Sequence, residues 1–243
     1  MCTVTFIPSG NHFFFTSSRD ERAERDPAIF PAIHEIGGQR LLFPMDLPLG
    51  GTWIAVHETG NIGVLLNGGI RAHVSNPPYR KSRGLVLLDL MSHFSPVEAF
   101  NECDFNGIEA FTVVLFENLK LYCVKWDGAR KWVELLNFRK PHIWSSVTLY
   151  TPDIIQKREG WFSEWLLKNQ NPSVADIIRF HMQGGDGDPA NDLLMNREDR
   201  LFTNSISSIR LSQDMAAFRY LDLRNGKKAN QFLPIQKIPS VKI

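Results

Sequence analysis

The sequence has almost no excess of charge of either sign, which argues against one broad class of function. Its 243 residues include 27 Lys and Arg against 26 Asp and Glu, a formal net charge of +1. Proteins that bind nucleic acid without sequence preference rely on a basic surface that neutralises phosphates. We therefore expect no general nucleic-acid affinity.

Long apolar runs and metal-ligand spacings are also missing. No apolar run approaches the ~18 residues of a membrane helix, and no basic segment followed by an apolar one suggests a signal peptide. The three cysteines, Cys2, Cys103 and Cys123, are an odd number without a CxxC or Cys/His spacing. We expect a reduced, cytoplasmic protein with no membrane span, disulfide framework, metal or cofactor.

The composition does provide ample material for a core. Apolar residues make up 43% of the chain and charged residues 22%, as in ordinary globular proteins. No internal repeat or low-complexity segment divides the sequence. We interpret residues 1–243 as a single domain, and nothing in the sequence indicates its oligomeric state.

Turn signals predict two β-hairpins in the first third of the chain. Two β-rich runs, 3–8 and 12–17, flank Ser9-Gly10-Asn11. The second run would bring the segment Ser18-Arg19-Asp20-Glu21 beside the start of the first. A second hairpin, 52–66, ends at Asn67-Gly68-Gly69, where glycines allow close approach of the backbone to a ligand. Residues 22–51 between them contain four prolines, and we expect an irregular segment that covers a site.

The order of the remaining elements indicates the fold class. Helices are predicted for 85–91, for a segment beginning at Ser95, for a segment beginning at Thr151 and for 173–182, and strands for 111–116, 119–125, 131–136, 144–150, 205–211 and 218–223. Runs of strands that alternate with pairs of helices favour antiparallel sheets with helices packed outside them over a βαβ arrangement. We predict an α+β fold, and a four-layer αββα sandwich of two stacked antiparallel sheets accommodates it.

Cys2 is the chemically distinctive residue of the amino terminus. Removal of Met1, which a small second residue permits, would leave a thiol and a free α-amine on one residue. Their unperturbed pKa values are about 8.5 and about 7.7–8.0, so the amine can accept the proton of the thiol. From position alone, however, an unremarkable second residue is the more common outcome.

Several motifs together resemble those of the NRDE proteins, bacterial relatives of the transport and Golgi organisation family. The motifs that carry the resemblance are Met1-Cys2-Thr3, Ser18-Arg19-Asp20-Glu21, Gly50-Gly51-Thr52-Trp53-Ile54, Leu65-Leu66-Asn67-Gly68 and Tyr79-Arg80-Lys81-Ser82-Arg83-Gly84. The resemblance extends from Cys2 to about residue 209. It implies the N-terminal-nucleophile (Ntn) hydrolase fold, which is an αββα sandwich.

A more distant similarity is to the cysteine Ntn amidases, which include bile salt hydrolases and penicillin V acylases. These enzymes also begin Met-Cys-Thr, place Arg and Asp at the end of the first hairpin, and carry an oxyanion-hole Asn on a strand similar to 59–67 of this chain. Two departures stand out. Ser18 replaces the first Asn of the usual Asn-Arg-Asp-Glu motif, and Ser145-Ser146 stands where a second amidase Asn is expected.

The resemblance implies roles around Cys2 as nucleophile. Arg19 would favour the thiolate, and Asp20 would orient the α-amine, although an ion pair that closes the hairpin explains both equally well. Glu21 would share that role or be solvated. Asn67 would donate to the oxyanion, the alternative being an ordinary Asn-Gly-Gly turn.

Other polar residues are candidates for substrate binding. Ser145 and Ser146 would form the opposite wall of the site. His73, Tyr79 and Arg83 belong to a polar loop with Arg80, which could receive a carboxylate or phosphate or simply be solvated. We expect His181, on an apolar helix face, to be a core histidine.

Two hypotheses for function follow from these residues and the resemblance. The first is a cysteine Ntn hydrolase that cleaves an amide or thioester of a small acyl compound. The second is a non-catalytic carrier on the same fold that binds a lipid-like or haem-like ligand.

Overall fold

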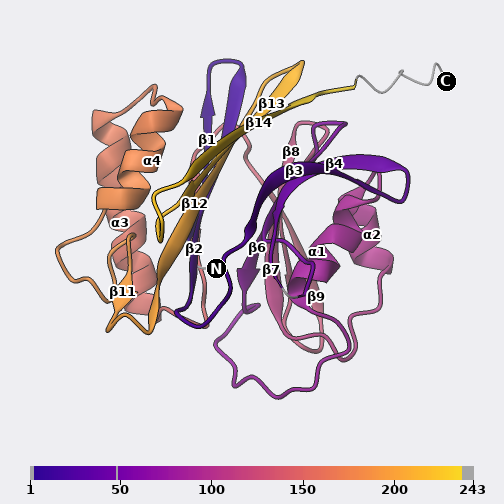
Figure 1. The fold of residues 1–243 in the computed structure, drawn as a ribbon, viewed down its shortest axis with the longest axis horizontal. Coiled ribbons are helices and arrows are strands. Elements are labelled where there is room, and N and C mark those ends of the chain that lie inside the picture. Colours follow the sequence, from indigo (N-terminus) through magenta and orange to yellow (C-terminus); the bar gives the residue numbers. More distant parts are fainter. Residues whose placement is uncertain (1–2, 48, 237–243) are drawn as a thin grey trace.

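The computed structural model describes residues 3–47 and 49–236 as four layers, with two antiparallel sheets stacked between two pairs of helices (Figure 1). The first sheet has the order β10-β1-β2-β12-β13-β14, with β11 paired to β12, and the second has the order β3-β4-β5-β6-β7-β8-β9. The predicted α+β sandwich is therefore confirmed. No helix in the described part of the chain is long and apolar enough to cross a membrane.

The strands of the first sheet are β1 (Thr3–Ser9), β2 (His12–Arg22), β10 (His142–Ser145), β11 (Asn196–Arg197), β12 (Leu201–Leu211), β13 (Met215–Asp222) and β14 (Lys228–Pro234). Those of the second are β3 (Ile29–Ile36), β4 (Gln39–Met45), β5 (Ile54–His57), β6 (Ile62–Asn67), β7 (Phe111–Glu117), β8 (Lys120–Trp126) and β9 (Lys131–Leu136). The helices are α1 (Arg83–Met91), α2 (Pro96–Glu102), α3 (Pro152–Lys168) and α4 (Val174–Gln183).

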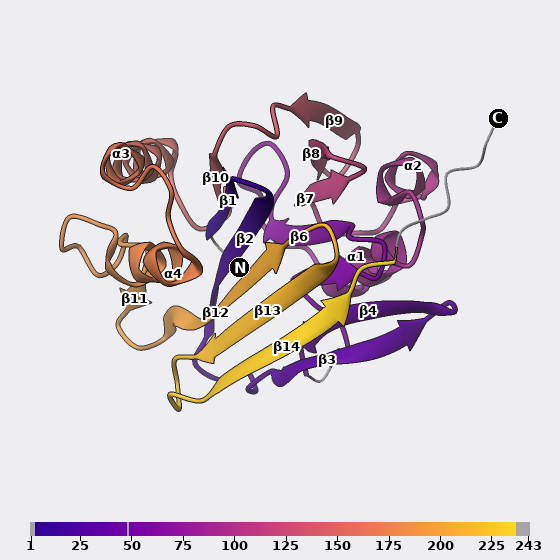
Figure 2. The same ribbon diagram turned by 90° about the horizontal axis from the view of Figure 1, so that it is seen from above.

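Three apolar clusters separate the four layers. The largest lies between the sheets and includes Phe6, Phe15 and Trp53. A second cluster joins α1 and α2 to the second sheet, and a third joins α3 and α4 to β1 and β2. Close packing of α1 on β6 needs Gly63, because a Cβ atom there would lie 2.6 Å from Sδ of Met91. Figure 2 shows the helix pairs on opposite outer sides of the stacked sheets.

The expectation of an irregular segment over residues 22–51 is wrong for much of its length. Strands β3 and β4 form a hairpin there, with Ile36 paired to Gln39 across Gly37-Gly38. Pro31 is tolerated because β3 is an edge strand and its register shifts between Ile29 and Ala32, and proline is confined to edges and bulges in sheets. The strand predicted over 144–150 is also wrong in extent, since β10 ends at Ser145.

Candidate functional site

A cleft of about 460 Å³ opens where the ends of β2, β4 and β6 meet the loop before α1. Most of the residues that line it are of polar or charged types, and the full set is Arg19, Glu21, Arg25, Asp46, Leu49, Gly51, Thr52, Trp53, Asn67, Tyr79, Lys81, Ser82, Arg83, Gly84 and Glu109. Five of the predicted site residues therefore lie around this one cavity. They are Arg19, Glu21, Asn67, Tyr79 and Arg83.

Arg19 is the best-anchored cation of the cleft. It is 2% exposed, and its Nη2 forms an ion pair with Asp46 and lies 3.7 Å from Oε2 of Glu21. Its guanidinium also stacks over the ring of Trp53, 4.7 Å from the centroid. Asp46 receives Arg25 on its other oxygen, and this hydrogen bond raises the pKa of Arg25. Contacts with Asp46, Glu21 and Trp53 thus fix the position of the Arg19 guanidinium.

Asp20 lies on the opposite face of the same strand, because successive side chains of a strand alternate. It is 2% exposed. Thr203 Oγ1 donates to its Oδ1 at 2.5 Å, and Tyr150 donates to its Oδ2 at 2.8 Å. Arg158 stacks on that tyrosine, 3.6 Å from the ring centroid, and donates to the side chain of Thr3. Asp20 therefore belongs to a buried polar network between the first sheet and the helix layer.

Asn67 ends β6 and faces the cleft from the second sheet. Its backbone carbonyl accepts a hydrogen bond from Ser146 Oγ at 2.8 Å. Its own Oδ1 is buried and has no hydrogen-bond partner among the described residues. The next residue, Gly68, has a φ of 85° and packs where a Cβ atom would lie 2.6 Å from Val147. The glycine therefore allows the end of β6 to approach the segment after β10.

Ser145 and Ser146 have different environments. Ser145 pairs with Thr3 in the β1–β10 register, so it lies next to the first residue of β1. Ser146 is fully buried and joins the ends of β6 and β10 through its bond to Asn67. Neither residue lines the described cleft, so Ser146 in particular supports the site from behind.

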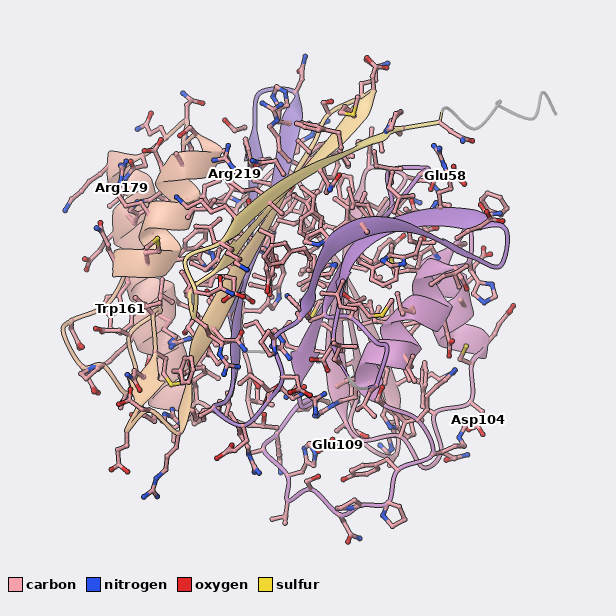
Figure 3. The ribbon with its side chains drawn as sticks, in the orientation of Figure 1. Glu58, Asp104, Glu109, Trp161, Arg179 and Arg219 are labelled. Carbon is pink, nitrogen blue, oxygen red and sulfur yellow. The ribbon has the colours of Figure 1, made fainter. Side chains whose placement is uncertain are left out.

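The polar loop before α1 is only partly directed at the cleft. Arg83 pairs with Glu109 at 3.0 Å, and His73 contacts the other oxygen of that carboxylate at 3.2 Å. Glu109 is labelled in Figure 3. Tyr79 accepts a hydrogen bond from the backbone of Asn76 at 2.7 Å. Arg83 and Tyr79 line the cleft, whereas His73 reaches it only through Glu109.

Several residues of this region have no signal in the sequence. Asp46, Tyr150, Arg158 and Thr203 belong to none of the motifs described above. Their partners lie as far as 183 positions away in the chain, so only the folded topology brings them together. Cys2 lies outside the described residues, and its neighbour Thr3 pairs with Ser18 as well as Ser145.

His181 is the core histidine that the sequence predicted. It is fully buried, with Nδ1 2.8 Å from Ser18 Oγ and Nε2 2.9 Å from Thr5 Oγ1. Desolvation, with a contribution from Arg158, lowers its pKa to about 3. Ser18 therefore has a structural partner of its own in this chain.

The sequence profile of one family, described as Transport and Golgi organisation 2, matches residues 1–209. The chain belongs to the Transport and Golgi organisation 2 family. This match confirms the family resemblance that the sequence motifs predicted. A search of curated proteins gives no match.

Solved structures similar to this Transport and Golgi organisation 2 family member have the Ntn-hydrolase fold. One is a cysteine-to-alanine mutant of the conjugated bile acid hydrolase from Clostridium perfringens, with a TM-score of 0.59, 13% identity and coverage of 100% of this chain and 99% of that chain. An arginine-to-leucine variant of that enzyme gives a TM-score of 0.59, 14% identity and the same coverage. The N-acylethanolamine-hydrolyzing acid amidase ortholog of Caenorhabditis elegans gives a TM-score of 0.57, 8% identity and coverage of 86% and 92%. At these identities the likeness concerns the fold.

Proposed function

We propose that this protein is a cysteine Ntn hydrolase that cleaves an amide or thioester bond of a small acyl compound. The observation that carries the proposal is the convergence of Arg19 and Asn67 on one cleft from two different sheets. Thr3 pairs with Ser18, the residue before Arg19. Because consecutive Cα atoms are only about 3.8 Å apart, the covalent link from Thr3 to Cys2 supports a nucleophile at this end of the hairpin.

The proposed reaction uses the two groups of Cys2 in turn. The α-amine accepts the thiol proton, and the thiolate sulfur attacks the acyl carbon. Asn67 and a backbone N–H donate hydrogen bonds to the developing oxyanion. The ammonium returns the proton to the leaving amine or thiol, which leaves a thioester on the sulfur. Water, deprotonated by the amine, then hydrolyses this thioester and releases the carboxylic acid.

The buried network behind the hairpin supports the same proposal. Asp20 would accept a hydrogen bond from the α-amine in addition to those from Tyr150 and Thr203, and Arg19 would stabilise the thiolate. Seven charged residues line the cleft, Arg19 and Arg83 among them, and they suit an acyl compound with a polar group better than a wholly apolar ligand. We therefore prefer the hydrolase to the carrier hypothesis.

Thiol labelling provides a test that needs no substrate. Burial raises the pKa of Cys123 to about 11 and also raises that of Cys103, so both react slowly at pH 7 because the thiolate is the reactive form. We expect a chloroacetamide probe to label Cys2 at least ~10-fold faster than either of them, as measured by peptide mass spectrometry. Equal labelling of the three cysteines would contradict an activated Cys2.

Two further measurements complete the test. Intact mass should show loss of Met1, and a retained methionine would remove the free amine and with it the proposed base. A screen of amides and thioesters should then find turnover that a Cys2→Ala variant lacks. A Cys103→Ala variant is the matched control and should retain full activity.

A further inference from the structure

A second concave site lies on the outer face of the first sheet, away from the cleft described above. A groove of about 560 Å³ runs between α4 and the outer face of β13 and β14. Its lining consists of Ala175, Ile178, Arg179, Met182, Gln183, Arg219, Leu221, Lys228 and Asn230. Figure 3 labels Arg179 on the helix and Arg219 beside it. This volume is in the range of small-molecule sites, about 300–1,000 Å³.

Strand alternation explains why these side chains share one face. Phe218 and Tyr220 of β13 and Leu233 of β14 point into the core between the sheets, so the residues between them point outward. In the β13–β14 register Leu221 pairs with Lys228, and Arg219 pairs with Asn230. Helix α4 packs on β12 and β2, and β13 and β14 continue past it (Figure 2). The groove lies in the angle between the side of α4 and the outer face of β13 and β14, which α4 leaves uncovered.

The charges of the groove are unbalanced. Arg179 has one carboxylate partner, Asp176, at 3.1 Å. Within residues 3–47 and 49–236, neither Arg219 nor Lys228 has a carboxylate within 4.0 Å, and Arg219 donates only a 3.3 Å bond to Asn230. Two positive charges are thus left without a counter-charge beside an apolar floor formed by Ile178, Met182 and Leu221. A dianion matches them in charge.

We propose that this groove binds a small, free phosphate monoester that carries an apolar body. A phosphate monoester has a charge of about −1.5 to −2 at pH 7, and guanidinium groups donate paired hydrogen bonds to phosphate oxygens. The apolar body packs over the floor beside α4. A smaller cavity of about 210 Å³, which shares Arg219 and Asn230 and contains the 57% exposed Phe232, extends the apolar surface. The recessed shape favours a free ligand over a flat membrane.

Calorimetric titration with hexyl phosphate and with inorganic phosphate tests the proposal. We expect saturable binding of hexyl phosphate that is tighter than that of inorganic phosphate. The double variant Arg219→Gln/Lys228→Gln should weaken hexyl phosphate binding at least ~10-fold, because replacing both cations by neutral amides removes the charge-assisted hydrogen bonds to the phosphate. The control variant Arg130→Gln/Lys140→Gln removes two exposed cations from the loops on either side of β9, in the other sheet. It should bind hexyl phosphate with the affinity of the parent protein.

Three results would overturn the proposal. The first is equal affinity of the parent and the Arg219/Lys228 variant. The second is no binding by the parent at millimolar hexyl phosphate. The third is sedimentation of the parent with phosphatidylcholine vesicles containing phosphatidic acid, lost in the variant, without binding of free hexyl phosphate, which would assign the groove to a membrane surface. Thermal unfolding of each variant checks that the fold is retained.

Discussion

The middle of the β1–β2 hairpin and its open end are equally buried but are built from opposite chemistry. In the middle, Phe6 and Phe15 are fully buried with ring centroids 4.9 Å apart. Near the open end, Ser18, Arg19 and Asp20 are at most 2% exposed. Burial of the rings is favourable because it removes apolar surface from water. Burial of the polar groups is unfavourable unless each one is hydrogen-bonded.

The difference separates apolar burial, which stabilises the fold, from specific hydrogen bonding, which constrains the residue types. The aromatic middle could be repacked by other apolar residues of similar volume. The polar end needs specific partners from distant elements, such as Asp46 for Arg19 and His181 for Ser18. Stability alone does not require a buried carboxylate and a buried guanidinium in neighbouring positions. That arrangement fits the reaction site that we propose.

The largest expected effect on stability is in the aromatic middle of the hairpin. Phe15→Ala should lower the free energy of unfolding by about 3–5 kcal/mol, because it removes a buried ring and leaves a cavity between the sheets. Denaturant unfolding followed by tryptophan fluorescence measures this change. Phe138→Ala, at a half-buried position on the margin of the same cluster, is the control and should cost clearly less. Equal costs would mean that Phe15 does not lie at the packed centre of the cluster.

At the polar end, Asp20→Asn should lower the free energy of unfolding by about 1.5–3 kcal/mol. The amide keeps the shape of the carboxylate but loses the charge-assisted bonds from Thr203 and Tyr150. The same unfolding experiment measures it. Asp199→Asn, at an exposed turn position, should change stability by less than about 0.5 kcal/mol. If both variants behave alike, the Asp20 network contributes nothing to the fold.

The sequence predicted those parts of the fold that depend on local chemistry. The first hairpin followed from Ser9-Gly10-Asn11, and Gly10 has the positive φ of 57° that such a turn favours. The hairpin β3–β4 was missed because prolines normally exclude strands, and only its place at the edge makes Pro31 acceptable. Edge position is a property of the sheet and cannot be inferred from a short window of sequence.

The candidate site shows the same division. Motif resemblance identified Arg19 and Asn67, which do share a cleft. It did not identify Asp46, which immobilises Arg19, or the pair Tyr150 and Thr203, which bond Asp20. These side chains are common residue types in unremarkable surroundings, and they acquire a role only when antiparallel strands distant in sequence are paired. The catalytic roles of Arg19 and Asn67 are predictions that the activity screen with the Cys2→Ala variant tests.

A pH titration of stability separates the buried histidine from the rest of the polar end. Desolvation lowers the pKa of His181 to about 3 in the folded protein, whereas an unfolded histidine has a pKa of about 6.5. The unfolded state therefore binds the proton first as the pH falls, and the stability present above pH 6.5 is lost toward pH 3. Linkage gives a loss of about 2 kcal/mol between pH 7 and pH 5.

The comparison protein for this titration is His181→Leu. Its unfolding free energy should show a shallower dependence over the same range, because the remaining six histidines are common to both chains. The informative quantity is the difference between the two curves. Parallel curves would show that His181 titrates in the folded protein much as it does when unfolded.

The smallest expected effect is that of Ser18→Ala, about 1 kcal/mol of unfolding free energy. The change removes the hydroxyl that lies 2.8 Å from Nδ1 of His181 and leaves that nitrogen buried without its partner. A double-mutant cycle with His181→Leu isolates the pair, since two residues in contact should show a coupling of at least ~0.5 kcal/mol. Additive changes in unfolding free energy would mean that the hydrogen bond between Ser18 and His181 does not contribute to stability. A clear coupling would show that the contact between Ser18 and His181 stabilises the fold.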